Sequence, residues 1–454
     1  MEAIKPDVLV IGAGSGGLSV AAGAAQMGAH VVLLEGHKMG GDCLNYGCVP
    51  SKALLAAGKV QMGYSAAKDY VQTAVATIAP HDSVERFEKL GVRVIKEFGS
   101  FISPTEVKAG DNIIRARRVV IATGSCPLIP KIPGLTDVPF YTNENIFDLR
   151  EKPKHLLIIG GGPIGMEMAQ AHRRLGCEVT VIEGQRALGK DDPEMSSIVL
   201  QSLRNDGITI FENTLAERIL GKAGNIEVKT SHDSVKGSHL LVAVGRKINI
   251  EKLNLSAGGI DVRSCAIKVD EQLKTTNKRV YAIGDVVGGL QFTHVAGYHA
   301  GVIIRSMLFA LPAKAKTAHL PWATYTDPEL AQVGLTQAQA LSRYGEKLSI
   351  VRFDFAGSDR AITDSKITGL IKVMVVKGRP VGASIAGTGA GDLIGLWSMA
   401  IANNLKMSAI ASTVLPYPSM GEVNKRVVSA YFSPMLFDNI MVKRFVRLVQ
   451  RLLP

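Results

Sequence analysis

The sequence predicts an α/β fold that contains two Rossmann-like units, and three observations lead to this prediction. A short apolar run, a glycine-rich turn, a helix of small residues and a second strand follow one another at two places in the chain. Corresponding positions are 148 residues apart, since Gly12 recurs as Gly160. The third observation is length, because 454 residues exceed one ordinary core and two to three domains are expected.

The first unit begins with the apolar run 7–11 (DVLVI), which is typical of a strand buried in a parallel sheet. A helix is expected to run to about Met27, and a strand over 30–34 leads to Glu35. Three glycines stand between the first strand and the helix in the spacing G-x-G-x-x-G: Gly12, Gly14 and Gly17.

The second unit repeats this order, with strands over 155–159 and 178–182 and the acid Glu183. Its glycines are Gly160, Gly162 and Gly165. The first glycine of such a turn allows the tight bend, the second lets backbone approach a pyrophosphate, and the third lets helix and strand pack closely. The phosphates then lie at a helix N-terminus, and the acid accepts hydrogen bonds from a ribose. The sequence therefore predicts two bound dinucleotides.

The acid of the second unit also bears on which nicotinamide cofactor is used. Glu183 would repel a 2′-phosphate, which favours NADH over NADPH. Arg186 and Lys190 follow closely and could soften this preference.

A cysteine pair lies shortly after the first unit, in GGDCLNYGCVPSK (40–52). Cys43 and Cys48 could form a metal clip, a structural staple or a reversible redox disulfide. The chain has five cysteines, and this odd count argues against a secreted disulfide framework. We find no signal peptide and no apolar run long enough to span a membrane, so a cytoplasmic location is expected.

Four stretches together resemble the pyridine nucleotide–disulfide oxidoreductases, the family of dihydrolipoamide dehydrogenase, glutathione reductase and mercuric reductase. They are GGDCLNYGCVPSK, IATGS (121–125), VYAIGDV (280–286) and PWATYTDPELAQVGLT (321–336). The resemblance implies a homodimer in which each active site borrows residues from its partner. It implies three domains: an FAD domain of 1–150 and 270–318, an NAD domain of 151–269, and an α+β dimerisation domain of 319–454.

The resemblance also implies the chemistry of the cysteine pair. NADH would reduce FAD, and the flavin would pass the electron pair to a Cys43–Cys48 disulfide. Cys48 would remain beside the flavin as a thiolate, while Cys43 attacks the substrate. Lys52 resembles the family lysine near the flavin nitrogen that accepts hydride, and Glu167 matches its acidic partner. No metal site is expected, because CxxxxC lacks a second ligand pair or a histidine cluster at zinc spacing.

Further cofactor contacts follow from the same resemblance. Glu35 would meet the adenosine ribose of FAD, and Asp285 the ribityl–pyrophosphate region. The other cofactor-binding candidates are Thr123, Gly124, Gly245 and Thr293. The remaining cysteines have no partner in motif spacing and are interpreted as packing residues: Cys126, Cys177 and Cys265.

The sequence departs from the family in how it would handle a substrate. In LPYPSMGE (415–422) the family glutamate is present as Glu422, but Tyr417 replaces the catalytic histidine. A phenol with a pKa of about 10 is a poor base at neutral pH. Mercuric reductases carry a tyrosine there, yet they use a C-terminal cysteine pair, and no cysteine follows Cys265 here. Pro163 stands where glutathione reductases have a gating tyrosine.

These features leave several functions open. The leading interpretation is an FAD-dependent, NADH-oxidising enzyme that acts on a disulfide or dithiol, like dihydrolipoamide dehydrogenase. The alternatives are a reductase of a soft metal ion or a quinone, and a redox subunit of a larger assembly. Three histidines near the motifs are candidates for the missing base: His37, His81 and His294.

The net charge of +12 accompanies no nucleic-acid motif, so most of it is interpreted as solvated surface. The C-terminal segment 437–454 is an exception, since it predicts an unbroken amphipathic helix. Its apolar face is expected to comprise Phe437, Ile440, Met441, Phe445, Leu448, Val449 and Leu452, and its cations are Lys443, Arg444, Arg447 and Arg451. Such a face packs on protein or lies peripherally on the inner face of the membrane.

Overall fold

The structure is a computed structural model that describes residues 3–453. The chain divides into two compact units. The first comprises the chain up to Gly184 together with Thr209–Lys316, and the second comprises Gln185–Ile208 together with the chain from Thr317 onward. The three expected domains and their boundaries stay a prediction.

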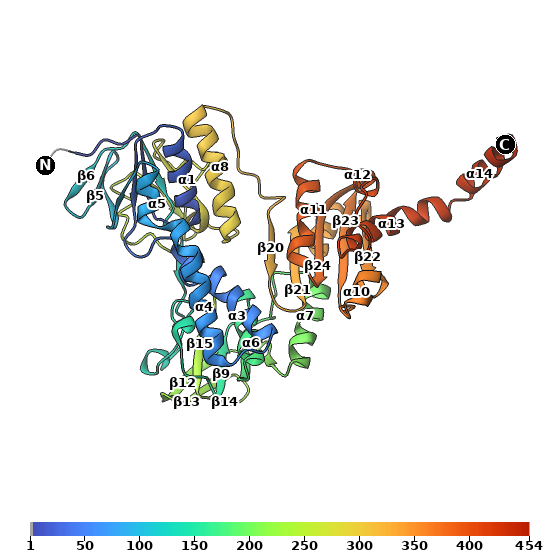
Figure 1. Cartoon of the computed structure of the whole chain (residues 1–454), viewed down its shortest axis with the longest axis horizontal. Coiled ribbons are helices and arrows are strands. Elements are labelled where there is room, and N and C mark those ends of the chain that lie inside the picture. The colour runs from blue at the N-terminus through green and yellow to red at the C-terminus, as the bar shows by residue number, and fades with distance from the viewer. Residues whose placement is uncertain (1–2, 454) are drawn as a thin grey trace. The chain divides into compact units, whose positions relative to one another are not determined.

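The first unit, coloured from blue through green to yellow in Figure 1, contains a five-stranded parallel sheet in the order β19-β7-β1-β2-β3. Its strands are β1 (Val8–Ile11), β2 (Val31–Leu34), β3 (Val92–Ile95), β7 (Arg118–Ile121) and β19 (Val280–Ala282). Successive residues of β1 enter different hydrophobic clusters: Val8 and Val10 pack on one face, Leu9 and Ile11 on the other. Both faces are therefore covered, which explains the continuous apolar run.

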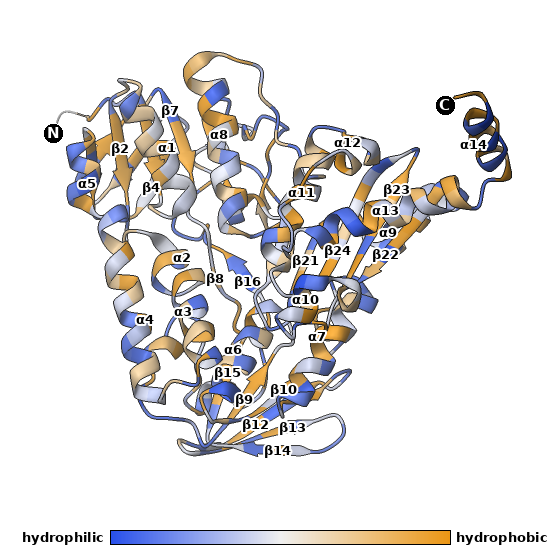
Figure 2. Ribbon diagram, turned by 45° about the vertical axis from the view of Figure 1, so that its right-hand side comes forward, coloured by the Kyte–Doolittle hydropathy of each residue, from blue (hydrophilic) through white to orange (hydrophobic). Residues whose placement is uncertain are grey.

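A second parallel sheet in the same unit has the order β11-β10-β9-β15. Its strands are β9 (His155–Ile159), β10 (Glu178–Ile182), β11 (Thr209–Phe211) and β15 (His239–Val242). The strands are coloured largely hydrophobic in Figure 2. The glycine turns lead into α1 (Ser15–Gln26) after β1 and α6 (Pro163–Arg174) after β9. The predicted pair of Rossmann-like units is confirmed.

The first and third glycines of each turn leave no room for a side chain. A Cβ on Gly17 would lie 1.9 Å from the carbonyl oxygen of Gly12, and one on Gly165 would lie 2.0 Å from that of Gly160. Gly12 and Gly160 have φ values of +105° and +113°, which L side chains rarely adopt. Each helix thus packs directly against the turn that precedes it.

Other elements of the first unit flank these sheets. The helices are α2 (Gly41–Asn45), α3 (Cys48–Lys59), α4 (Tyr64–Ile78), α5 (Val84–Lys89) and α8 (Thr293–Phe309). Two small antiparallel sheets are formed by β4 (Gly99–Ser103), β5 (Glu106–Ala109) and β6 (Asn112–Ile114), and by β12 (Ala216–Lys222), β13 (Asn225–Thr230) and β14 (Ser234–Gly237). Strand β8 (Ser125–Pro127) pairs with β16 (Arg246–Ile248).

The second unit is built on a five-stranded antiparallel sheet in the order β20-β21-β24-β23-β22. The strands are β20 (Pro321–Thr324), β21 (Glu329–Gly334), β22 (Leu348–Asp354), β23 (Leu370–Val376) and β24 (Arg379–Gly387). Its helices are α7 (Pro193–Asn205), α9 (Gln337–Tyr344), α10 (Asp359–Thr363), α11 (Ala390–Ala402), α12 (Met407–Ala411), α13 (Glu422–Phe437) and α14 (Ile440–Leu452). The core centres on buried Trp397, whose indole N–H donates to Asn424 Oδ1 at 2.7 Å. The expected α+β character is confirmed.

A buried ion pair joins α7 to this sheet. Lys372 Nζ lies 2.7 Å from Asp192 Oδ1 and 2.6 Å from Glu194 Oε2, and the lysine side chain is 2% exposed. The segment Gln185–Ile208, which the sequence places in the NAD domain, is held to the C-terminal sheet by these contacts. Within residues 3–453, no helix is both long and apolar enough to cross a bilayer.

Candidate active site

Both cysteines lie on short helices beside the first glycine turn. Cys43 is on α2, and Cys48 is the first residue of α3. Gly41 has a φ of +60°, and a Cβ there would lie 2.7 Å from the Cα of Gly14. The backbone N–H of Gly40 also donates to the carbonyl oxygen of Ala13 at 3.0 Å. The glycines that open α2 thus let the cysteine segment pass directly against the first dinucleotide loop.

The two cysteines are thiols in this structure, and their environments differ. Cys48 is exposed and Cys43 is half-buried. A hydrogen bond with Cys43 is the main cause that lowers the pKa of Cys48 to about 6, and Thr293 and Lys52 act in the same direction. The Sγ of Cys48 lies 3.5 Å from the Oγ1 of Thr293, at the start of α8. The same hydrogen bond between the two thiols raises the pKa of Cys43 far above its usual range, so Cys48 is the more acidic of the pair.

An ion pair connects the cysteine helix to the second Rossmann-like unit. Lys52, one turn beyond Cys48 on α3, places its Nζ 2.7 Å from the Oε2 of Glu167 on α6. The Glu167 side chain is 5% exposed and that of Lys52 is 36% exposed. Pro163 is the first residue of α6, where its ring suits the helix start and its missing N–H costs nothing.

A second charged cluster includes Asp42 of the cysteine segment, and of its members only Asp285 is predicted from the sequence. Arg246 Nη2 lies 3.2 Å from Asp42 Oδ2, and Arg246 Nε lies 3.8 Å from Asp285 Oδ2. Ser125 joins them, since its hydroxyl donates to Asp285 at 2.5 Å and accepts from Arg246 Nε at 2.7 Å. Asn143 donates to the other oxygen of Asp42 at 3.1 Å.

Burial raises the pKa of Asp285, while the Ser125 hydroxyl and Arg246 oppose that shift. Arg246 therefore pairs with two carboxylates, Asp42 and Asp285, of which Asp42 directly precedes Cys43. The only sequence signal for Arg246 was its place directly after Gly245. In the structure Gly245 has a φ of +141°.

The acids of the two Rossmann-like units point into their own glycine turns. Glu35 accepts from the backbone N–H of Ala13 at 2.7 Å, and Glu183 accepts from that of Gly161 at 2.6 Å. A Cβ on Gly14 or Gly162 would meet nothing within 4 Å. These second glycines leave the approach to the helix N-terminus open, as a pyrophosphate requires, so the residues fit FAD and a nicotinamide dinucleotide.

The remaining predicted flavin contacts lie where β7 ends. The Thr123 hydroxyl donates to the carbonyl oxygen of Asn249 at 2.6 Å, and the N–H of Asn249 donates to the carbonyl of Gly124 at 3.0 Å. Gly124 has a φ of +66°, which favours glycine at this turn.

Tyr417 and Glu422 belong to the second unit, and the cysteine pair belongs to the first. Tyr417 is 68% exposed, and its hydroxyl donates to Asp359 Oδ2 at 2.9 Å. This hydrogen bond raises the pKa of Tyr417, which makes the phenol a still poorer base. Glu422 is the first residue of α13.

The structure gives a neighbour for each of the candidate histidines. His37 packs edge-on against Phe98, with ring centroids 5.0 Å apart, and His294 stacks on Phe292 at 5.5 Å. The backbone carbonyl of His81 accepts from Arg86.

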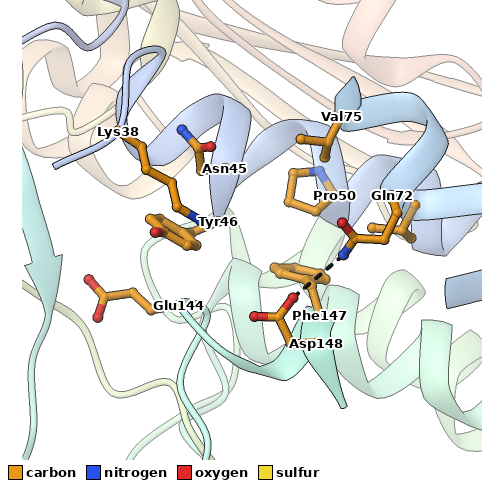
Figure 3. A pocket seen from close by; sticks show the side chains of 10 residues that line it. Lys38, Asn45, Tyr46, Pro50, Gln72, Val75, Glu144, Phe147 and Asp148 are labelled. Carbon is orange, nitrogen blue, oxygen red and sulfur yellow. Dashed lines mark hydrogen bonds between the residues drawn. The ribbon is translucent and has the colours of Figure 1, made fainter. Parts of the chain in front are cut away.

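A small cavity lies behind the cysteine helices (Figure 3). Its volume is about 70 Å³, and it is lined by Lys38, Asn45, Tyr46, Pro50, Val71, Gln72, Val75, Glu144, Phe147 and Asp148. This volume suits a few water molecules and is too small for a dinucleotide. Within residues 3–453, no group of three or more His, Cys, Asp and Glu side chains is arranged to hold a metal ion.

Two Rossmann-like units, a paired thiol and thiolate at the first glycine turn, and an antiparallel C-terminal sheet define a disulfide oxidoreductase that uses two dinucleotides. The chain belongs to the pyridine nucleotide-disulphide oxidoreductases. The model of that family matches residues 6–300, and the model of its dimerisation domain matches residues 320–428.

Three relatives illustrate the similarity. A mercuric reductase of Bacillus cereus is 34% identical over 451 residues, which cover 94% of this chain and 71% of the relative. A dihydrolipoyl dehydrogenase of Bacillus subtilis is 33% identical over 455 residues, which cover 92% of this chain and 95% of the relative. The Cu(II) complex of the HOCl-induced flavoprotein disulfide reductase RclA from Escherichia coli has a TM-score of 0.87 and 28% identity, and covers 93% of this chain and 99% of its own.

The predicted family, fold class and enzyme class are thereby confirmed. The protein is an FAD-dependent oxidoreductase that uses a nicotinamide dinucleotide and a cysteine pair. The dimerisation domain supports a homodimer.

Proposed function

We propose that the protein passes electrons from NADH, through FAD and the Cys43–Cys48 pair, to a soft metal ion. The observation that carries this proposal is the state of Tyr417, whose hydroxyl is bonded to Asp359 and whose pKa is raised. Reduction of a disulfide needs a group that exchanges a proton with the product thiol at neutral pH, and a phenol with a raised pKa does this poorly, whereas a soft metal ion binds thiolates without such a group. The cysteine pair supplies sulfur ligands for such an ion, with Cys48 exposed and Cys43 half-buried.

The reaction balances without a further reactant. NADH gives up one hydride and becomes NAD⁺. The hydride supplies two electrons, and its proton is released. Two Cu(II) ions would each take one electron and become Cu(I), or one Hg(II) ion would take both. FAD, when bound, accepts the hydride and hands on the electron pair. We assign Cys48 to the flavin side as thiolate, Cys43 to the acceptor side, and the Lys52–Glu167 pair to the flavin edge.

A disulfide acceptor is the second candidate, and it is favoured by Glu422 at the start of α13 and by the similarity to dihydrolipoyl dehydrogenase. A steady-state screen of Cu(II), Hg(II), lipoamide, glutathione disulfide and quinones tests both. The proposal expects NADH oxidation with the metal ions to exceed that with lipoamide at neutral pH. Fast lipoamide turnover by the wild-type protein would overturn it.

The proposal includes NADH rather than NADPH as the electron donor. Glu183 closes the second turn with a carboxylate that repels a 2′-phosphate. Arg186, the nearest cation in sequence that could offset it, donates to the Pro193 carbonyl and the Ser196 hydroxyl, both at 2.8 Å. The ratio of kcat/KM for NADH and NADPH, in wild type and Glu183→Ala, tests this choice.

We extend the proposal to the homodimer and to its location in the cell. Tyr417 and Glu422 of one subunit would complete the cysteine site of the partner, and the three-domain division given above would hold. We place the homodimer in the cytoplasm, with peripheral membrane contact through residues 437–454. The exposed apolar and cationic side chains of this segment support the contact.

A further inference from the structure

The last helix of the chain, α14, has no buried residue. All its side chains are exposed or half-buried. Its start is specified locally, because Asn439 Oδ1 accepts from the backbone N–H groups of Met441 and Val442 at 2.9 and 3.3 Å. This cap interrupts the helix that the sequence predicts over 437–454, so Phe437 belongs to α13 and the amphipathic element begins at Ile440.

Helical geometry separates α14 into two faces. At about 100° per residue, its apolar side chains other than Ile440 fall within an arc of about 160°. These are Met441, Val442, Phe445, Val446, Leu448, Val449 and Leu452. The opposite arc of about 120° holds Gln450 and all four cations, Lys443, Arg444, Arg447 and Arg451. At the same angle per residue, Ile440 lies among the cations, which corrects its expected place on the apolar face.

The large apolar side chains on this face are strongly exposed. Exposure is 70% for Met441, 65% for Phe445, 52% for Leu448 and 73% for Leu452. A contiguous apolar surface of this kind marks an interaction site rather than ordinary surface. It also lies beyond residues 320–428, which match the dimerisation domain of the family.

Building on the membrane contact proposed above, we infer that α14 docks on an anionic lipid surface, apolar face inserted and cations against the headgroups. Charge complementarity carries the choice of partner, because four cations accompany the apolar face and no acidic residue follows Asp438. A wide apolar arc bordered by cations suits a helix that lies in the plane of the headgroups.

The homodimer would strengthen this docking. Each subunit contributes one α14, so binding of the second helix becomes intramolecular once the first is bound. Each cation near an anionic surface contributes about 5-fold to binding. Docking should therefore depend steeply on lipid charge and on salt, and it should not require a specific lipid.

Flotation of the holoenzyme with lipid vesicles tests the inference. One set of vesicles contains equal parts of phosphatidylglycerol and phosphatidylcholine, and the other contains phosphatidylcholine alone. The wild type should float with the anionic vesicles at low salt only, since the screening length is about 3 Å at 1 M salt. Arg447→Gln/Arg451→Gln should weaken binding at low salt by about 25-fold for each docked helix. Phe445→Ser/Leu448→Ser and a chain that ends at Leu436 should not float.

The matched control is Lys222→Gln/Lys236→Gln, which removes the same charge from exposed positions of β12 and β14. It should float like the wild type. Equal flotation of the Arg447/Arg451 variant and the wild type would overturn the inference, as would equal recovery of the chain that ends at Leu436. Dissociation of that shortened chain into monomers would show instead that α14 packs on a second copy.

A second measurement on the same samples, NADH oxidation, tests the redox proposal separately from the docking. NADH oxidation with a dissolved acceptor should be equal in wild type and in the chain that ends at Leu436. Loss of flotation with full activity supports docking through α14. Flotation without any NADH oxidation would leave the docking standing and overturn the redox proposal.

Discussion

The Nζ of Lys52 lies 2.7 Å from the Oε2 of Glu167, so the helix that begins at Cys48 is tied to the helix that begins at Pro163. Glu167 is 5% exposed, which makes this a largely desolvated pair. The bond links the thiolate to the second Rossmann-like unit, where we expect the nicotinamide to bind. Lys52 and Glu167 are 115 positions apart in the sequence, so their contact depends on the tertiary fold.

Substitutions of Lys52 and Glu167 should shift the pKa of Cys48 in opposite directions. Lys52 lowers the pKa of Cys48, whereas the charge of Glu167 raises it. Lys52→Met should therefore raise the Cys48 pKa above about 6, and Glu167→Gln should lower it. A pH titration of the long-wavelength thiolate–flavin absorbance in the holoenzyme measures both. Shifts in the same direction would contradict this account of the site.

The two cysteines should respond differently to replacement by serine. Cys48→Ser should abolish the thiolate–flavin band while FAD remains bound, because it removes the thiolate. Cys43→Ser should show the band without NADH, because Cys48 can no longer be held in a disulfide. Absorbance spectra of the purified proteins check this. Full disulfide or metal turnover by both variants would contradict the assignment of the pair.

Removal of Arg246 should destabilise the fold in a pH-dependent way. The Arg246 side chain is 13% exposed and neutralises Asp42 and Asp285, so Arg246→Gln should cost about 3 kcal/mol near neutral pH. Without the cation the already raised pKa of Asp285 rises further. A raised carboxyl pKa means that the folded state holds its proton longer than the unfolded state. The loss of stability should therefore grow as pH rises above the ordinary carboxyl range, and shrink below it.

Urea unfolding of the Arg246→Gln protein at several pH values measures this loss. Arg115→Gln is the matched control, because Arg115 is 58% exposed and pairs with Glu106 on the surface. The control should change the free energy of unfolding by less than about 1 kcal/mol. A loss for Arg246→Gln that is independent of pH would contradict the role given to Asp285.

Tyr417 should limit the rate of turnover with dithiol substrates but not with metal ions. Tyr417→His supplies a base with an ordinary pKa near neutrality, and it should raise dihydrolipoamide oxidation by about 10²–10⁴-fold. Tyr417→Phe should leave metal-ion reduction unchanged, since no base is needed there. Steady-state rates at neutral pH check both variants. Efficient wild-type dihydrolipoamide oxidation would refute this prediction.

Local features of the site were accessible from the sequence. The glycine turns depend on residues within a few positions of one another, so Gly12, Gly17, Gly160 and Gly165 could be assigned from spacing alone. The break before α14 was accessible too, because Asn439 directly before an apolar period is a typical N-cap, yet the periodicity alone concealed it.

The charged cluster around Arg246 could not be predicted in this way. Arg246 reaches Ser125 because β16 pairs with β8, and it reaches Asp42 through the folding of distant segments. Neither contact has a fixed spacing in sequence. Sequence pattern likewise gave no sign that Asp359 engages Tyr417, since the two are 58 residues apart.

Stopped-flow reduction of the anaerobic holoenzyme by NADH tests the central claim most directly. The account predicts that NADH reduces the enzyme with the appearance of a long-wavelength thiolate–flavin band. That band should then decay, with release of Cu(I), when Cu(II) is mixed in. Flavin reduction without the band, or a band in the Cys48→Ser protein, would contradict the passage of electrons through the Cys43–Cys48 pair.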